Sequence, residues 1–240
     1  MRFIEYVRLP TWAIAFAILF ACAGKLSATE VCGLSPYTLG CSALLKASEA
    51  KATVGVIPYY VHNKQVYILL GRERVDSKKT GAAGTFSDFG GSVKLDGTTI
   101  LQNAVRELAE ETMDEIRVKE SQLLNKARLL YTKTKEGRQV FYLFYPMSGK
   151  DYILTRDFNI LRAKASAYKI NPAYLEKDQF VWFKLDDIVS NIPDNANENT
   201  KVSATDIDGN THDIMLRGYF VKDCLLHPEL ANLAAKLPIG

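Results

Sequence analysis

Residues 89–111 read FGGSVKLDGTTILQNAVRELAEE, with two glycines ahead of a run of acidic residues. Glu107, Glu110 and Glu111 are spaced i, i+3 and i+4, so on a helix their side chains share one face. Three ionised carboxylates crowded together repel one another unless a cation lies among them. Gly90 and Gly91 lack a Cβ, which lets backbone approach such a cation or an anionic ligand closely. The stretch therefore predicts a cation-dependent site.

The same stretch predicts a helix from Thr99 to about Glu115. Thr99 and Gln102 have the spacing of a capping box, in which each side chain bonds the other residue's backbone N–H. An apolar stripe at helical spacing follows, made of Leu101, Ala104, Val105 and Leu108. One side of this helix is therefore expected to pack on the core while the acids face elsewhere.

From Gly91 to Asp114 the chain resembles the signature of the Nudix hydrolases, G-x5-E-x7-R-E-U-x-E-E-x-G-U, where U is a bulky aliphatic residue. The R-E-U-x-E-E section is matched throughout, by Arg106, Glu107, Leu108, Glu110 and Glu111. The resemblance implies an α/β fold, the α/β/α sandwich with a mixed β-sheet. It also implies an enzyme that hydrolyses pyrophosphate bonds.

Two departures from the signature matter. Counting back from Arg106, the first family Glu falls on Thr98 and the family Gly falls on Ser92, so the loop is one residue longer. We expect Asp96 to replace that Glu, or Thr98 or Thr99 simply to cap the helix. The later family Gly is Met113, which predicts a helix that continues through Asp114.

By the resemblance, Glu107, Glu110 and Glu111 are the ligands of Mg²⁺ or Mn²⁺, and one of them helps to deprotonate the attacking water. Mg²⁺ prefers a few carboxylates together with water and phosphate oxygens. Arg106 orients a glutamate of the helix, and a carbonyl near Gly90 and Gly91 offers a further metal contact. The expected substrate is a nucleoside diphosphate linked to another moiety. The alternative is a catalytically weak or inactive Nudix-like module that binds or senses nucleotides.

Several residues outside the signature are candidates for supporting roles. The candidates for a general base are Glu136, Glu176, Asp186 and Asp187, although a solvated surface acid is the simpler interpretation of each. The candidates for phosphate contact are Arg72, Arg74, Lys78 and Lys79. The candidates for base stacking are Tyr59, Tyr60, Phe141, Tyr142 and Trp182, which equally suit a strand core.

Alternating and β-rich runs predict strands at 53–61, 65–70, 86–93, 127–132, 139–145 and 180–183. His62-Asn63-Lys64 and Asp208-Gly209-Asn210 are turn signals between strands. Helical segments are expected at 185–189 and at 219–237, with an interruption near Pro228.

The N-terminus predicts export. Arg2 and Arg8 precede an apolar run of about 14 residues, TWAIAFAILFACAG, which is short for a membrane span of about 20 and is typical of a signal peptide. The alternatives are a lipoprotein with Cys22 acylated, or an uncleaved anchor. We therefore divide the chain into 1–28 (signal peptide or membrane anchor), 29–51 (linker) and 52–240 (Nudix hydrolase domain). The expected location is periplasmic or secreted, or membrane-anchored through the N-terminal segment.

Net charge and cysteine positions limit which binding partners and disulfides are expected. The formal net charge is +3 with no basic run, which disfavours sequence-specific binding to nucleic acid. Membrane contact is expected only through the N-terminal segment. A homodimer is one open assembly state. Cys32 and Cys41 bracket a short loop that suits either a disulfide or two free thiols.

Overall fold

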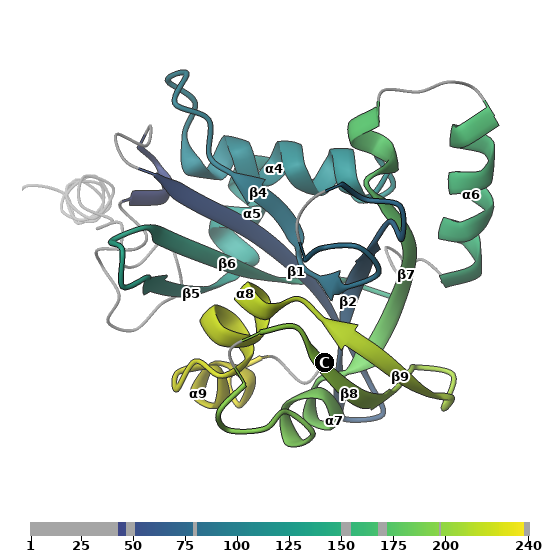
Figure 1. The fold of residues 1–240 in the computed structure, drawn as a ribbon. Coiled ribbons are helices and arrows are strands. Elements are labelled where there is room, and N and C mark those ends of the chain that lie inside the picture. The colour runs from purple at the N-terminus through teal and green to yellow at the C-terminus, as the bar shows by residue number, and fades with distance from the viewer. Residues whose placement is uncertain are drawn as a thin grey trace, which may run out of the picture.

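One mixed β-sheet organises the chain in the computed structural model (Figure 1). The structure describes residues 43–46, 51–78, 81–149, 155–167, 172–196 and 198–237. Segment 1–28, including Cys22, lies outside the described residues, as do Cys32 and Cys41 and most of the predicted linker. No helix within the described ranges is long and apolar enough to cross a membrane.

Nine strands of the described chain form the sheet, in the order β5-β6-β1-β2-β3-β9-β8, with β4 paired to β1 and β7 paired to β2. They are β1 (Ala52–His62), β2 (Gln65–Glu73), β3 (Phe86–Ser87), β4 (Phe89–Ser92), β5 (Arg128–Lys133), β6 (Gln139–Pro146), β7 (Lys177–Lys184), β8 (Thr200–Thr205) and β9 (Thr211–Leu216). The β1–β6 and β3–β9 pairs are parallel and the others antiparallel. The predicted mixed sheet is confirmed.

Helices cover both faces of this sheet. On one side lie α4 (Ile100–Glu111), α5 (Glu120–Lys126) and α6 (Thr155–Ala167). On the other lie α7 (Leu185–Ser190), α8 (Gly218–Phe220), the π-helical turn η2 (Val221–Leu225) and α9 (Leu230–Ala234). Figure 1 shows α4 above the sheet and α7 and α9 below it. The predicted α/β/α sandwich is therefore confirmed.

Side chains that alternate along the strands pack into two hydrophobic cores, one on each face of the sheet. On β6, Val140, Tyr142 and Phe144 enter the core beneath α7, η2 and α9, whereas Phe141 and Leu143 enter the core beneath α4. Successive side chains of a strand point to opposite faces, so a strand covered on both sides is apolar throughout. Burying each such side chain contributes about 1.5–3 kcal/mol. Leu44, within the predicted linker, is also buried in the α4-side core.

The first hairpin is present where His62-Asn63-Lys64 predicts it, with a two-residue turn because His62 belongs to β1. Asn63 and Lys64 connect β1 to β2 and have φ of 49° and 63°. Both central residues of a type I′ turn need positive φ, and this turn matches the twist of the strands it joins. The second predicted hairpin is also present, because β8 pairs with β9 across the Asp208–Asn210 turn.

The predicted strand 86–93 is instead two short strands with Asp88 between them. Phe86 and Ser87 of β3 pair with β2, whereas β4 pairs with the first half of β1. The chain thus crosses from one neighbouring strand to another at Asp88. This crossing carries Gly90 and Gly91 to the edge of β1, beside α4.

Helix α4 is shorter than predicted. It begins after the N-cap Thr99 and ends at Glu111, with Thr112 as C-cap. Met113 and Asp114 then have φ of 56° and 64°. The expectation that replacing the family Gly by Met113 would prolong the helix was wrong, because Met113 takes the left-handed conformation that glycine usually supplies at such ends.

Candidate active site

The N-terminus of α4 is fixed by the predicted capping box. Thr99 Oγ1 accepts a hydrogen bond from Gln102 N at 3.0 Å, and Gln102 Oε1 accepts one from Thr99 N at 2.9 Å. Thr98 Oγ1 donates to Asp96 Oδ1 at 2.6 Å and accepts from Asn103 Nδ2 at 2.8 Å. Of the two expectations for this loop, helix capping by Thr99 is confirmed. The exposed Asp96 binds Thr98.

Arg106 joins two of the signature glutamates. Its guanidinium donates to Glu107 Oε1 at 2.5 Å and to Glu110 Oε2 at 2.7 Å. A third contact, of 3.2 Å, reaches Asn103 Oδ1. The carboxylates of Glu107 and Glu110 are 15% and 25% exposed, so both can still be reached by a ligand. Arg106 thus fixes the orientation of two acids that would otherwise repel each other.

Glu111 lies deeper than the other two glutamates. Its Oε2 accepts a hydrogen bond from Gly90 N at 2.8 Å, and its Oε1 lies 3.8 Å from Lys177 Nζ. Lys177 also lies 3.4 Å from Glu73 Oε2. Neither Lys177 nor Glu73 was predicted from the sequence. Both come from strands whose local sequence carries no sign of a buried charge.

Burial perturbs the acids of this region. Loss of solvent raises the pKa of Glu111 to about 8, although the Lys177 ammonium opposes the shift. Burial likewise raises the pKa of Glu107 against the effect of Arg106, and raises the pKa of Asp88 to about 6. Clustered acids with raised pKa values are typical of functional sites, because structures for stability alone seldom bury several carboxylates together.

At Gly91, β4 lies close to α4. A Cβ built on Gly91 would lie 2.8 Å from Glu107 Oε1, closer than real Cβ contacts allow. The absent side chain leaves room for the Glu107 carboxylate. The glycine pair of the signature thus brings the strand edge into contact with the acidic face of α4.

A pocket of about 310 Å³ adjoins this edge on the face of the sheet opposite α4. It is lined by Thr53, Val54, Gly55, Asp88, Gly90, Gly91, Ser92, Arg138, Val140, Tyr142, Arg217, Tyr219 and Asp223. The Arg217 guanidinium carbon lies 4.7 Å from the Tyr219 ring centroid. The Tyr142 hydroxyl is buried and has no hydrogen-bond partner among the described residues. The pocket therefore offers two guanidinium groups and an unsatisfied hydroxyl to a ligand.

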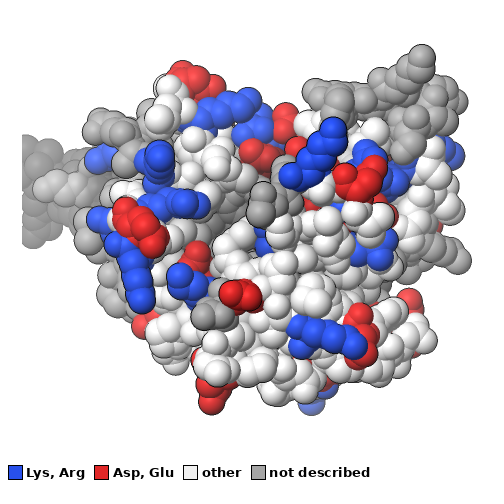
Figure 2. Space-filling model, viewed as in Figure 1, with Lys and Arg blue, Asp and Glu red and all other residues white. Residues whose placement is uncertain are grey.

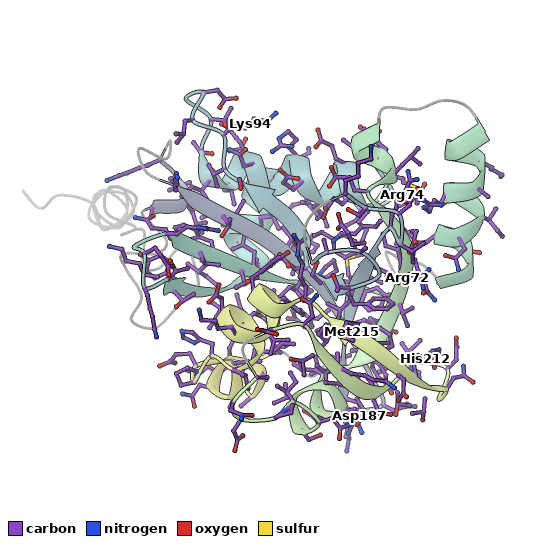
Figure 3. The ribbon with its side chains drawn as sticks, viewed as in Figure 1. Arg72, Arg74, Lys94, Asp187, His212 and Met215 are labelled. Carbon is purple, nitrogen blue, oxygen red and sulfur yellow. The ribbon has the colours of Figure 1, made fainter. Side chains whose placement is uncertain are left out.

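Of the four candidate bases, the structure brings Glu176 near the signature glutamates, where its charge contributes to the raised pKa values of Glu107 and Glu111. Glu136 is exposed on the β5–β6 turn. Asp186 and Asp187 begin α7, across the sheet from α4, and Figure 3 shows Asp187 at that far side.

The candidate phosphate contacts are largely engaged elsewhere. Arg72 Nε donates to Asp178 Oδ1 at 2.6 Å, and Arg74 pairs with Asp76. Figure 3 shows Arg72 and Arg74 together near the end of β2. Lys78 is exposed in the following loop, and Lys79 lies outside the described residues. Of the five aromatic candidates, Tyr142 lines the pocket, whereas Phe141 and Trp182 are buried in the α4-side core.

Fold and site together define an α/β/α protein in which a strand edge joins an acidic helix to a pocket with two arginines. The NUDIX domain model matches residues 50–205, which is more than half of the 240-residue chain. The chain belongs to the Nudix family of pyrophosphohydrolases, as the signature predicted. Among curated proteins, none matches this chain.

Several solved structures are similar at low identity. The NUDIX domain of Shewanella oneidensis NrtR complexed with ADP ribose has 14% identity and a TM-score of 0.40, over 79% of this chain and 92% of that one. A C. elegans Ap4A hydrolase has 17% identity and a TM-score of 0.36, over 59% of this chain and 85% of that one. A MutT/nudix family protein from Enterococcus faecalis has 12% identity and a TM-score of 0.38, over 93% and 74%. Similarity at this level does not identify a substrate.

Proposed function

We propose that this chain is a metal-dependent hydrolase that cleaves the pyrophosphate bond of a nucleoside diphosphate linked to another moiety. One observation carries the proposal. Gly90 donates its N–H to Glu111, Gly91 abuts Glu107, and both glycines line the pocket that holds Arg138 and Arg217. A ligand in this pocket would meet the two guanidinium groups and would lie against the glycine edge whose backbone contacts Glu107 and Glu111 of α4.

The donor set fits a hard divalent cation. No group of three His, Cys, Asp or Glu side chains in the described ranges converges as a preformed cage. Mg²⁺ needs only one or two carboxylates, because water and substrate phosphates complete its six positions. Glu107 and Glu110 supply two accessible carboxylates held by Arg106, and the predicted role of Glu111 stays a prediction. When bound, Mg²⁺ or Mn²⁺ would screen phosphate oxygens and acidify a water.

The chain's own groups have separable tasks in this proposal. Arg106 holds Glu107 and Glu110 in one arrangement. One of the signature glutamates is proposed to accept a proton from the attacking water, as the family resemblance implies. Arg138 and Arg217 bind phosphate oxygens as guanidinium groups do. The Tyr142 hydroxyl, which has no partner among the described residues, would hydrogen-bond a ligand in the pocket.

The test is Glu110→Gln in purified protein. With a nucleotide panel that includes ADP-ribose and dinucleoside polyphosphates, and with Mg²⁺ present, we expect turnover to fall by roughly 10²–10³-fold, since one carboxylate beside the reacting phosphates is lost. The matched control is Glu115→Gln, an exposed acid just beyond α4. Equal turnover in Glu110→Gln and wild type would refute the assigned role.

A second candidate is a nucleotide-binding module with weak or absent turnover. It is favoured by Thr98 at the position of the first family Glu, and by Lys177 beside Glu111. Calorimetry with ADP-ribose, run beside a turnover assay, separates the two. Tight binding without product over hours supports the module, and clear turnover eliminates it.

We also propose that the protein is exported, on the basis of the apolar N-terminal run alone. Fractionation of the producing cells tests this proposal. Recovery of the unprocessed chain solely from the cytosol contradicts it. Size-exclusion chromatography of the same preparation would test the homodimer.

A further inference from the structure

Lys177 is an unusual residue of the α4-side region. It opens β7 opposite Glu73 of β2, and its side chain is only 2% exposed. The aliphatic part lies over Gly71, where an added Cβ would meet it at 3.0 Å. Nζ donates to Ser87 Oγ at 3.1 Å and lies 3.4 Å from Glu73 and 3.8 Å from Glu111. The ammonium therefore sits among carboxylates inside the protein.

The surrounding side chains are acidic. Glu73, Asp88 and Glu111 are all buried, and Lys177 is the one buried cationic side chain among the described residues. Removing an ammonium from water is costly, and lysine is rarely buried without a charged partner. Pairing with Glu73 and Glu111 offsets that cost here. A divalent ion placed between the same carboxylates would supply the same electrostatic effect.

We propose that Lys177 is a built-in cation that occupies the Glu73–Glu111 side of the acidic cluster and so weakens divalent-cation binding there. Lys177 is thus a positioning residue. It holds Glu111 by charge and leaves the accessible Glu107–Glu110 side to the metal. The inference rests on the proposed metal site and adds that this chain supplies part of the cluster's counter-charge itself.

The test measures metal binding and not turnover. Mn²⁺ alone is titrated by calorimetry into purified full chain, and into Lys177→Gln and Lys177→Met. Removing one positive charge within a few ångströms at an effective dielectric of about 20 should raise Mn²⁺ affinity by roughly tenfold or more. The rise in melting temperature caused by Mn²⁺ should be correspondingly larger in both variants than in wild type.

Two controls make the result specific. Lys184→Met removes a lysine at the other end of β7, where it pairs with Asp187 at 3.3 Å, and should leave Mn²⁺ affinity unchanged. Lys177→Gln keeps a hydrogen-bond donor for Ser87 while losing the charge. If Lys177 is only structural, Lys177→Gln should be as stable as wild type and should bind Mn²⁺ no more tightly. That result would overturn the proposal.

Each remaining outcome is also decisive. A Lys177 variant that unfolds alone but refolds when Mn²⁺ is added supports the proposal. One that stays unfolded in millimolar Mn²⁺ overturns it, because the metal then fails to replace the ammonium. If wild type binds Mn²⁺ and hydrolyses nucleotides while Lys177→Gln binds no better, this inference fails and the proposed function stands. If neither wild type nor the variants bind Mn²⁺, both fail.

Discussion

Arg106 holds two glutamates at once, which makes it the most informative single residue for function. We expect Arg106→Met to lower kcat by about 100-fold with little change in KM, because the carboxylates lose their fixed orientation while the pocket keeps its own contacts. Steady-state kinetics on the best substrate of the panel measures this split. The matched control is Arg117→Met, which removes an arginine that is 72% exposed and pairs only with Asp114 in the described contacts. A 100-fold rise in KM at constant kcat would instead place Arg106 in substrate binding.

Asp114 tests the strained end of α4. Its φ of 64° is disfavoured for residues with a Cβ and more strongly for a β-branched one. We expect Asp114→Val to lower the free energy of unfolding by about 1–2 kcal/mol, whereas Asp114→Asn should stay close to wild type because asparagine tolerates this conformation. Chemical denaturation measures both. Equal stability of the Val and Asn variants would show that the backbone here relaxes without cost.

Single residues differ in how visible they are in the sequence. The spacing of Glu107, Glu110 and Glu111 predicts a shared helix face, and the structure places them on one. Lys177 could not be predicted, because its burial arises only when β7 pairs with β2 and carries it beside Glu73. Tyr142 was a stacking candidate, but its unsatisfied hydroxyl depends on packing from β1, β4 and α8.

Helices and strands were predictable where a strong periodic pattern coincided with a cap or turn residue. The α4 stripe and its capping box fixed the start of that helix, and turn residues marked both hairpins. By contrast, α6 was not predicted. Phe158 is buried there while Ile160 is 52% exposed, so its apolar residues do not form a clear stripe. The end of α4 was misjudged because Met113 gives no local signal for a left-handed conformation.

The turn between β8 and β9 is held by Asp206. Its Oδ1 accepts from the backbone N–H of Asp208 and Asn210 at 3.0 and 2.8 Å, and its Oδ2 lies 2.7 Å from His212 Nε2. Burial alone would raise the pKa of Asp206, but the hydrogen bonds from His212 and Asn210 outweigh it and leave the pKa lowered.

The lowered pKa of Asp206 determines how the stability of the protein depends on pH. A carboxyl with a lowered pKa in the folded state contributes stability above its unfolded pKa of about 3.9, and loses it as pH falls through the folded value. We expect Asp206→Asn to cost about 1–3 kcal/mol at pH 7, a difference that shrinks as the pH falls below about 4. Urea denaturation from pH 7 to pH 3 measures it. Asp208→Asn, an exposed change in the same turn, is the control, and a difference that grows toward low pH would contradict the assignment.

At the scale of the whole molecule, two cores share one sheet. Phe220 is fully buried in the core opposite α4, and its ring centroid lies 6.1 Å from that of Tyr142 at the pocket. We expect Phe220→Ala to lower the free energy of unfolding by about 3–5 kcal/mol, and to weaken nucleotide binding because Tyr142 loses its support. Denaturation and calorimetry measure the two effects. Ile160→Ala is the exposed control. If Phe220→Ala is destabilised but binds nucleotide as wild type does, Phe220 does not support Tyr142 in the pocket.

The overall architecture was accessible from a short signature, but the pocket was not. The family match ends at residue 205, whereas Arg217, Tyr219 and Asp223 come from later elements that fold back over the sheet. Figure 2 shows blue and red side chains interspersed on the face in view, which agrees with the absence of a basic run in the sequence. The charge composition of the sequence therefore predicts a surface of mixed charge. The residues that line the pocket could not be predicted in the same way, because tertiary packing brings them together.

Gly55 of β1 leaves the space that Asp88 fills, because a Cβ at position 55 would lie 1.6 Å from Asp88 Oδ2. The two positions are coupled by simple exclusion. If residue 55 is randomised and folded variants are selected, almost all of them should carry glycine. Other residues should be recovered at position 55 only if residue 88 is randomised too and becomes smaller. In that double library, alanine or serine at 55 should emerge only in company with a shorter residue at 88.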